Sequence, residues 1–263
     1  MDNHSNEPVL LRQVQDGVAT VTLNRPQARN ALSMGLMGEL ITAFDALAQD
    51  KDVKVVILAA AGPGFCAGHD LKELRSQPKR EIYQAVFRRC SQLMQAIVSL
   101  PKPVIAQVHG IATAAGCQLA ATCDLAVASD DARFATPGVN IGLFCSTPMV
   151  ALSRAIPRKQ AMEMLLTGDM IPAARALEIG LINRVVPAAE LPAATLALAR
   201  QIAGKSPLVL KIGKEAFYRQ AEMGLAQAYD YASEVMTRNM MAADAAEGID
   251  AFLGKRPPNW RGE

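Results

Sequence analysis

Two short stretches, each at the expected start of a helix, are the part of this sequence best suited to chemistry. The first is Ala114-Ala115-Gly116 and the second is Gly68-His69-Asp70. The residues of the first stretch are small enough for a ligand to approach their backbone closely. The first amides of a helix lack partners and carry partial positive charge, so they favour negative charge on a carbonyl oxygen. Both stretches therefore suit an oxyanion hole, and both are also compatible with ordinary strand-to-helix turns.

Apolar strands precede both stretches and would position them. The run Lys54–Ala61 is continuously apolar, which is typical of a strand covered on both faces, and Val104–Val108 reads as a second buried strand. A tight turn is expected over His109–Ala114, followed by a short helix from about Ala115. Another apolar strand is expected at Leu125–Ala128.

The rest of the chain alternates strands and helices and then ends in helices alone. A β-hairpin turns at Asp16-Gly17. The strands of the hairpin are 9–14 and 18–23, and further strands are expected at 133–135 and 184–186. Further helices are expected at 33–47, 81–100, 148–155, 158–166 and 172–178. From Leu191 the pattern gives only helices, at 191–203, 207–221, 225–241 and 243–253. We predict an α/β core over residues 1–190 and a helical region over 191–263 that packs on the core or on another subunit.

Composition and charge favour a globular protein with a substantial core. Of the 263 residues, 51% are hydrophobic, and the net charge is only +2. We therefore expect neither nucleic acid nor a membrane as a partner, and we find no apolar leader at the N-terminus. Five cysteines without metal-ligand spacing indicate buried thiols, no metal site and a reducing compartment, so a cytoplasmic location is expected. Lys211, Lys214 and Lys255 are interpreted as solvated charges, although a phosphate of a ligand could use one of them.

Five segments, in register, resemble the enoyl-CoA hydratase/isomerase family, also called the crotonase superfamily. They are PGFCAGHDLKEL (63–74), HGIATAAGCQLAATCDLAVAS (109–129), FATPGVNIG (134–142), LLTGDMIPAARALEIGLINRVVP (165–187) and AFLGKRPP (251–258). The resemblance extends from the hairpin to the C-terminus in the family's order. Within the family, the shorter segments CAGHDLKEL, ATAAGCQL, FATPGVN and GLFCSTP are most similar to one particular branch.

The resemblance implies a fold, an assembly and a ligand. The fold is the crotonase (ClpP-like) spiral of ββα units, with a C-terminal helical region that makes homotrimers, which pair into hexamers. The ligand is an acyl-CoA thioester, which is the substrate and not a cofactor; no other cofactor is expected. The family's oxyanion hole uses two backbone N–H groups, which match His69 and Ala115. Its CoA-contacting positions match Arg25, Ala28, Ala31, Ala67, Asp70 and Leu71, with Phe252 and Lys255 supplied by a neighbouring subunit.

Both positions at which hydratases of this family carry glutamate are replaced here. The matching residues are Gln118, in the helix after the second oxyanion turn, and Gly138, after the proline of a later loop. A carboxamide does not exchange protons near neutral pH and glycine has no side chain, so the acid and base for hydration are missing. The aspartate nucleophile of the family's dehalogenases matches Ser146. A glutamate restored at position 138 would be strained if the backbone there is left-handed.

Two kinds of function remain open. Loss of CO₂ from a malonyl-type thioester makes an enolate directly, and CAGHD and TPGVN are similar to the family's methylmalonyl-CoA decarboxylases, whose tyrosine position matches Cys145. His69 then binds a carboxylate or protonates the enolate, or acts only through its N–H. Gln118 orients water or substrate or is inert, and Cys145 is a weak acid or a buried small hydrophobe. The other function is that of a non-catalytic acyl-CoA sensor or scaffold.

Overall fold

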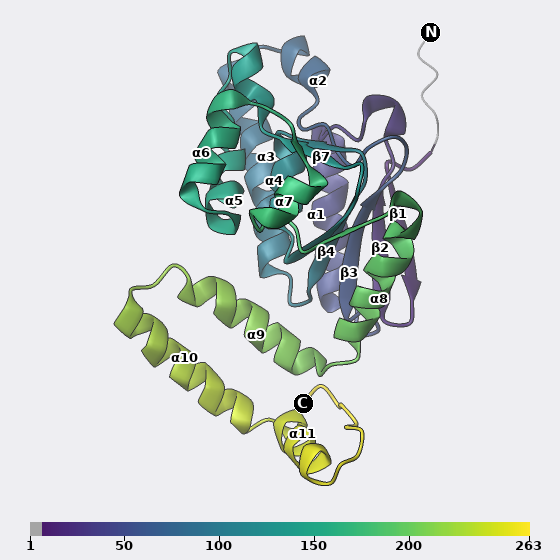
Figure 1. The fold of residues 1–263 in the computed structure, drawn as a ribbon, viewed down its shortest axis with the longest axis vertical. Helices are drawn as coiled ribbons and strands as arrows, with labels where there is room; N and C mark the ends of the chain where they lie inside the picture. Colours follow the sequence, from purple (N-terminus) through teal and green to yellow (C-terminus); the bar gives the residue numbers. More distant parts are fainter. Residues whose placement is uncertain (1–6) are drawn as a thin grey trace.

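A computed structural model describes residues 7–263, which form two sheets, helices on both faces of the larger sheet and a helical arm (Figure 1). The larger sheet has the order β1-β2-β3-β4-β6-β9, antiparallel between β1 and β2 and parallel elsewhere. Its strands are Leu10–Gln15, Val18–Leu23, Val55–Ala60, Val104–Val108, Leu125–Ser129 and Arg184–Val186. The smaller sheet has the order β5-β7-β8, with strands Ile111–Thr113, Arg133–Ala135 and Ile171–Pro172.

The helices begin and end close to the predicted positions. The core helices are α1 (Met34–Gln49), α2 (Leu71–Ser76), α3 (Arg80–Ser99), α4 (Ala115–Thr122), α5 (Pro148–Ala155), α6 (Arg158–Thr167) and α7 (Ala173–Glu178). They are followed by α8 (Leu191–Ala203), α9 (Pro207–Gln220), α10 (Leu225–Met240) and α11 (Ala243–Leu253), and the 3₁₀ turns are η1 (Pro26–Ala28), η2 (Pro137–Ile141) and η3 (Ala188–Glu190). Over residues 7–263, no helix combines the length and apolar character needed to cross a bilayer. The prediction about an N-terminal leader concerns residues that lie partly outside this range.

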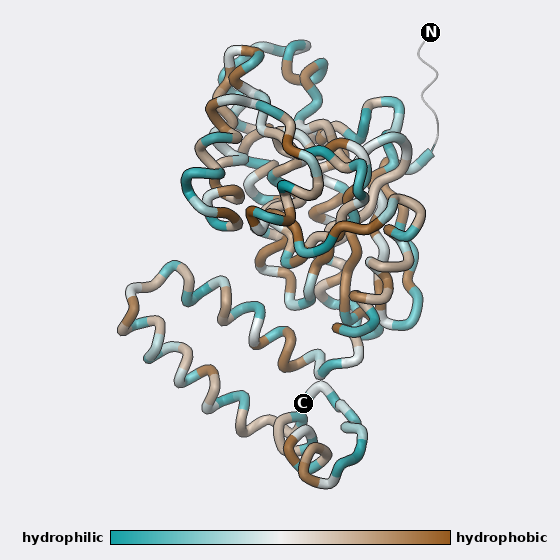
Figure 2. The backbone as a smooth tube through the Cα atoms, in the orientation of Figure 1, coloured by the Kyte–Doolittle hydropathy of each residue, from teal (hydrophilic) through white to brown (hydrophobic). Residues whose placement is uncertain are grey.

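The larger sheet is covered on both faces, as the apolar run of β3 predicts. Val56 and Leu58 face the core cluster that includes α1 and α3, whereas Val55, Ile57 and Ala59 face the cluster built on α8. Successive side chains of a strand point to opposite faces, so both sets must be apolar to remain buried. Figure 2 shows the resulting concentration of apolar residues along the core strands.

The turns of the spiral are stacked in register, and this brings two distant segments together. One turn of the spiral consists of β4, β5 and α4. In the turn of the spiral before it, the segment around Cys66 occupies the position that corresponds to β5. Cys66 pairs with Ala112 of β5 as a parallel bridge, with N–H···O distances of 3.0 Å to Ile111 and 2.9 Å from Thr113. Three residues further along each segment, the same register places His69 beside Ala115. The crotonase spiral inferred from the resemblance is therefore confirmed.

One predicted feature differs from the structure. The tight turn expected at His109–Ala114 contains strand β5, which is only three residues long and is defined by its pairing with Cys66 and β7. Helix α8, the first of the predicted helical region, packs on the core, which is one of the two arrangements expected for that region: Leu191, Leu198 and Ala199 lie against the sheet. By its contacts α8 belongs to the core. The part that projects from the core consists of α9–α11, residues 207–253, which we call the arm (Figure 1).

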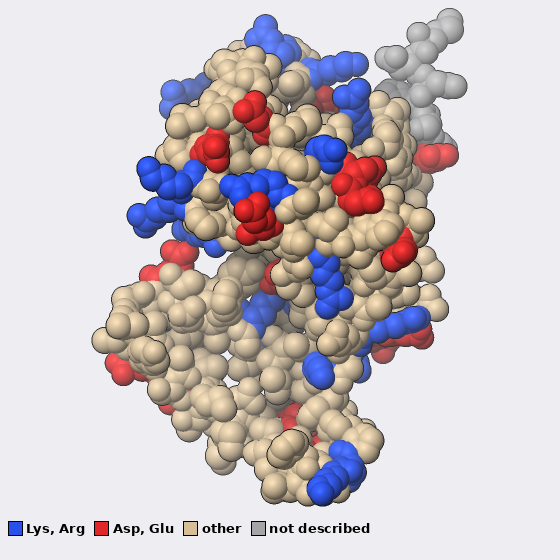
Figure 3. Space-filling model, viewed as in Figure 1, with Lys and Arg blue, Asp and Glu red and all other residues tan. Residues whose placement is uncertain are grey.

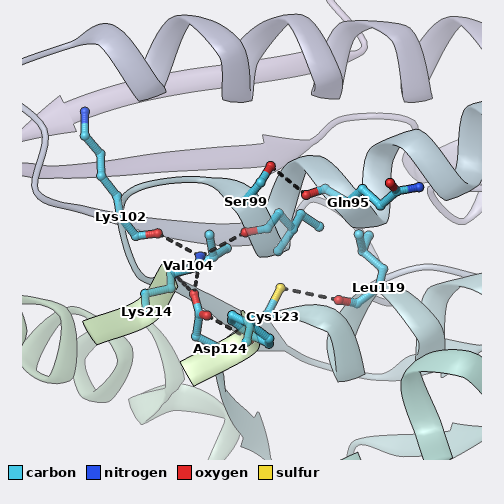
Figure 4. Close-up of polar contacts among 10 residues, drawn as sticks. Gln95, Ser99, Lys102, Val104, Leu119, Cys123, Asp124 and Lys214 are labelled. Carbon is cyan, nitrogen blue, oxygen red and sulfur yellow. Dashed lines mark hydrogen bonds and ion pairs between the residues drawn. The ribbon is translucent and has the colours of Figure 1, made fainter. Parts of the chain in front are cut away.

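A buried ion pair attaches the arm to the core (Figure 4). The Lys214 ammonium donates to Asp124 Oδ2 at 2.7 Å and to the carbonyls of Ile97 and Lys102 at 2.9 and 3.0 Å. Tyr218 donates to Asp124 Oδ1 at 2.9 Å. The Lys214 side chain is only 6% exposed, so its interpretation as a solvated charge was wrong. Burial lowers its pKa, and the charge of Asp124 opposes that effect.

Candidate active site

The backbone N–H groups of His69 and Ala115 lie at one place and lack acceptors. Among residues 7–263, neither N–H donates to a protein atom. Their turns are in contact, because a Cβ added to Gly68 would lie 3.3 Å from the Ala115 nitrogen and 2.9 Å from the Ala114 Cβ. Ala115 also begins α4, where the helix leaves its first amides unpaired. The two turns in contact thus each carry an amide without a protein acceptor in the described chain.

Ala114 holds a backbone conformation that favours glycine. Its φ is +51° and its ψ is −119°, directly before the Ala115 amide. A residue with a side chain is strained in this region by about 1–3 kcal/mol, and such strain persists only where the surroundings impose it. Here the Ala114 N–H donates to Ala135 O at 2.9 Å, which fixes the turn from the β7 side.

Ala114→Gly is therefore expected to raise the free energy of unfolding by about 1 kcal/mol, measured by urea denaturation. The matched control is Ala121→Gly within α4, where helical backbone makes the same change cost about 1 kcal/mol. Equal losses in the two variants would show that Ala114 is unstrained.

The imidazole of His69 is the most unusual side chain near these amides. Both ring nitrogens are buried, and within the described chain neither has a hydrogen-bond partner. The ring lies against Phe87 of α3, with centroids 5.4 Å apart. Burial lowers the His69 pKa, so the ring is neutral at pH 7. A buried polar atom without a partner costs free energy, so these nitrogens are available to a ligand.

The two positions that carry glutamate in hydratases are occupied by groups that do not exchange protons. Gln118 is buried one turn after Ala115, and its Oε1 accepts from the Cys90 thiol at 3.8 Å. At Gly138 a Cβ would lie 2.6 Å from Leu143 O and 2.8 Å from Cys145 Sγ. Burial raises the pKa of Cys145, so its thiol stays neutral. The restriction at position 138 is therefore lack of space, and not a left-handed backbone, since its φ is not positive.

The carboxylates nearest the first oxyanion turn have structural partners. Asp70 caps α2 by accepting from the Glu73 N–H at 3.2 Å, and it also accepts from Arg25 at 3.0 Å. Burial alone would raise the Asp70 pKa, but the hydrogen bonds from Arg25 and the helix amides outweigh it and lower the pKa. Glu73 accepts from the Met34 N–H at 2.9 Å. Both carboxylates hold loops together.

The structure gathers most of the predicted CoA-contacting residues but not all of them. Arg25 donates to Ala31 O at 2.5 Å as well as to Asp70, so its guanidinium joins these loops. Ala67 lines a cavity of about 230 Å³ together with Arg29, Pro63, Gly64 and Ile111. Ala28 lies in η1, and Leu71, half exposed, begins α2. Phe252 and Lys255 lie at the end of the arm, away from these loops (Figure 1). Their contact with CoA remains a prediction.

Several residues at the site were not identified from the sequence. Phe87 contacts His69 and Cys90 contacts Gln118. Helical periodicity identifies the buried side of α3, but it does not show that buried Cys90 or half-exposed Phe87 meets the site. Arg29, beside Ala67, gave no signal in the sequence.

Ser146, which matches the nucleophile position of the family's dehalogenases, is exposed, and its Oγ donates to Phe144 O at 3.3 Å within its own loop.

Comparison with known proteins agrees with this fold. Residues 13–263 match the model of the family described as Enoyl-CoA hydratase/isomerase. The human mitochondrial enoyl-CoA hydratase domain-containing protein 3 is 50% identical over 256 residues, 97% of this chain and 84% of that protein. That protein represents the branch to which the shorter motifs are most similar. A crystal structure of an enoyl-CoA hydratase from Mycobacterium smegmatis superposes with a TM-score of 0.94 at 54% identity, covering 97% and 99% of the two chains.

A more distant relative, 2,3-dehydroadipyl-CoA hydratase of Escherichia coli, is 34% identical over 94% of this chain and 96% of that protein. The predicted cytoplasmic location is contradicted, because the human and mouse relatives at 50% identity are named as mitochondrial. Cysteine usage reports a reducing environment and does not distinguish the compartments that provide one. The family match spans nearly the whole chain and agrees with the spiral fold. This chain belongs to the enoyl-CoA hydratase/isomerase family.

Proposed function

We propose that this protein binds an acyl-CoA thioester and stabilises its enolate between the N–H groups of His69 and Ala115. The observation that carries the proposal is the contact between two turns that each present an amide without a protein acceptor. When negative charge develops on the thioester oxygen, each such donor contributes about 3–4 kcal/mol in a site that excludes water. Family membership supports a CoA thioester as the ligand.

Decarboxylation of an alkylmalonyl thioester is the lyase reaction that these residues support best. The bond between the α-carbon and the carboxylate breaks, CO₂ leaves, and the electron pair forms the enolate without any base. A bound carboxylate beside His69 would oppose the effect of burial and raise the pKa of the ring. His69 would then take up a proton on binding and deliver it to the α-carbon, which balances the reaction.

Two-glutamate hydration has less support, although the E. coli relative is named as a hydratase. The Gln118 carboxamide does not act as a general base, and Gly138 lacks space for a side chain. A non-catalytic acyl-CoA sensor is the second candidate. It is favoured by the neutral state of Cys145 and by the engagement of Asp70 and Glu73 in structural contacts.

The purified protein should therefore decarboxylate an alkylmalonyl-CoA faster than it hydrates crotonyl-CoA, with CO₂ release and loss of enoyl absorbance measured side by side. Fast hydration that Gln118→Ala abolishes would contradict the assignment. Saturable CoA-thioester binding without turnover on either substrate would leave the sensor as the function.

We also propose that the arm joins copies into trimers that pair into hexamers. Its large apolar side chains are exposed in the single chain, among them Phe217, Leu225, Tyr229, Met236 and Phe252. Figure 3 shows few charged atoms on the face of the arm in view. Exposed apolar area of this extent usually marks an interface. Light scattering at micromolar concentration should give the mass of three or six chains, and a monomer would contradict the proposal.

A further inference from the structure

Residues 256–263 return to the turn between α8 and α9, where the arm leaves the core (Figure 1). That turn spans residues 204–206. The Trp260 indole N–H donates to Gly204 O at 3.0 Å. A Cβ added to Gly262 would lie 3.4 Å from the ring of the proline that begins α9. The segment therefore contacts both sides of the turn, and we call residues 256–263 the clasp.

A buried carboxylate of α11 connects the clasp to this turn. Asp244 is 1% exposed, and its Oδ2 accepts from the Ser206 hydroxyl at 2.5 Å and from the Gly262 N–H at 3.0 Å. Its Oδ1 accepts from the Arg261 N–H at 2.7 Å, and its own N–H donates to Glu263 O at 2.9 Å. Hydrogen bonds to an ionised group are stronger than those between neutral groups. Because Ser206 also caps α9, the Asp244 carboxylate joins α11, α9 and the clasp at one point.

A second set of contacts holds the clasp along the same side of α11. Glu247 accepts from Nη1 and Nη2 of Arg256 at 2.7 and 2.8 Å. The Trp260 ring covers Gly248, where an added Cβ would lie 3.1 Å from the ring. Glu247 and Gly248 are three and four residues after Asp244, so all three lie on one side of the helix. The clasp therefore binds one defined side of α11.

Another side of α11 is apolar and exposed. Ile249, Phe252 and Leu253 are spaced by three and four residues, so they share this side. Together with the exposed apolar side chains of α9 and α10, they form the arm surface that we propose as the contact between copies. The contacts with the clasp fix the rotation of α11 about its axis. They thereby fix the direction in which these three side chains point.

We propose that the clasp locks α11 onto the α8–α9 turn and that assembly of copies through the arm depends on its closure. The inference rests on the assembly proposed above, because it names the contacts that hold the assembling surface in place. An open clasp would free α11 to rotate and would leave the apolar side chains of α11 without a fixed arrangement. A surface that must first be ordered binds more weakly, since association then costs additional conformational entropy. Closure of the clasp therefore sets the protein concentration at which copies assemble.

Two variants of the full-length protein open the clasp in independent ways. Asp244→Asn removes the charge at nearly constant volume, whereas Gly248→Leu favours the helix but occupies the place of the Trp260 ring. In both variants the amides of residues 261 and 262 should exchange hydrogen at least about tenfold faster than in the wild type, because the Asp244 carboxylate no longer holds them. Asp250→Asn, at an exposed position of α11, is the matched control and should keep the wild-type exchange rates.

Two further measurements connect the clasp to assembly. The emission of Trp260, the single tryptophan of the sequence, should move to longer wavelength in both opening variants and stay unchanged in Asp250→Asn. Light scattering over a dilution series should show that the opening variants dissociate at a protein concentration at least about tenfold higher than the wild type does.

The outcomes separate this inference from the proposed assembly. If the wild type is a monomer at micromolar concentration, the proposed assembly itself fails. If the amides of the clasp exchange faster and assembly is unchanged, the inference is overturned and the proposed assembly stands. Exchange in both opening variants that equals exchange in Asp250→Asn would show that these contacts do not hold the clasp, and it would also overturn the inference.

Discussion

Replacing His69 by alanine is expected to lower kcat for alkylmalonyl-CoA decarboxylation by about 10²–10³-fold. The substitution removes the ring nitrogens, which are buried and have no partner in the described chain, but it keeps the backbone N–H of residue 69. The loss would therefore report the proton that the ring delivers to the α-carbon. The measurement is steady-state CO₂ release across the pH range 5–9.

Comparison with His69→Gln separates delivery of the proton from binding of the carboxylate. Glutamine donates a hydrogen bond but does not titrate, so its KM should stay nearer the wild-type value while kcat falls as far as in His69→Ala. The control is the same pair of substitutions at His109, whose ring contacts Gly62 O at 2.8 Å. An unchanged kcat in His69→Ala would show that only the backbone N–H of this residue matters.

The same ring gives the folded protein a pH dependence of defined sign. Burial lowers the His69 pKa below its ordinary value of 6.5. At pH values near and below 6.5 the unfolded chain therefore binds a proton at this residue more readily than the folded chain does. This group's contribution therefore reduces the free energy of unfolding as pH falls from 7 toward 5. The decrease should be smaller in His69→Gln than in the wild type.

Gly68→Ala is expected to lower kcat by about 10²–10³-fold, comparable to the loss of one oxyanion donor. The added Cβ would lie 2.9 Å from the Ala114 Cβ and 3.0 Å from Thr113 O, so the two oxyanion turns must separate. The atoms on the other side of the contact are the Ala114 Cβ and backbone atoms, which yield less readily than the end of a flexible side chain.

Gly180→Ala controls for backbone strain in this experiment. Gly68 and Gly180 have φ values of +95° and +82°, so alanine is strained at both, but a Cβ on Gly180 meets nothing within 4 Å. Both variants should lose stability, and only Gly68→Ala should lose turnover beyond about twofold. Equal kcat values in the two variants would show that the spacing of the turns does not limit the reaction.

The elements of the fold could be predicted because each has a local signal. Ser33 and Asp70 both cap helices through their side chains, and the apolar run of β3 is buried from both faces. Strand β5 was missed because three residues give no periodicity, and only pairing with Cys66 and β7 defines it. The contact between the two predicted oxyanion turns follows from the same pairing. From the sequence, this contact could be predicted only through the resemblance to a family.

Features that depend on contacts distant in sequence could not be predicted. Lys214 is buried because Asp124, 90 residues earlier, and two carbonyl groups surround its ammonium, whereas composition alone suggests solvent. The space at Gly138 is limited by Leu143 and Cys145 from the following loop. The unpartnered ring of His69 depends on how α3 packs against it, through Phe87.

The most direct test of the account is the structure of this protein with a bound saturated acyl-CoA. The thioester oxygen should lie about 2.7–3.1 Å from both the His69 and the Ala115 nitrogen, with no carboxylate within hydrogen-bond reach of the α- or β-carbon. A thioester oxygen held by other groups, or a glutamate or aspartate beside those carbons, would contradict it.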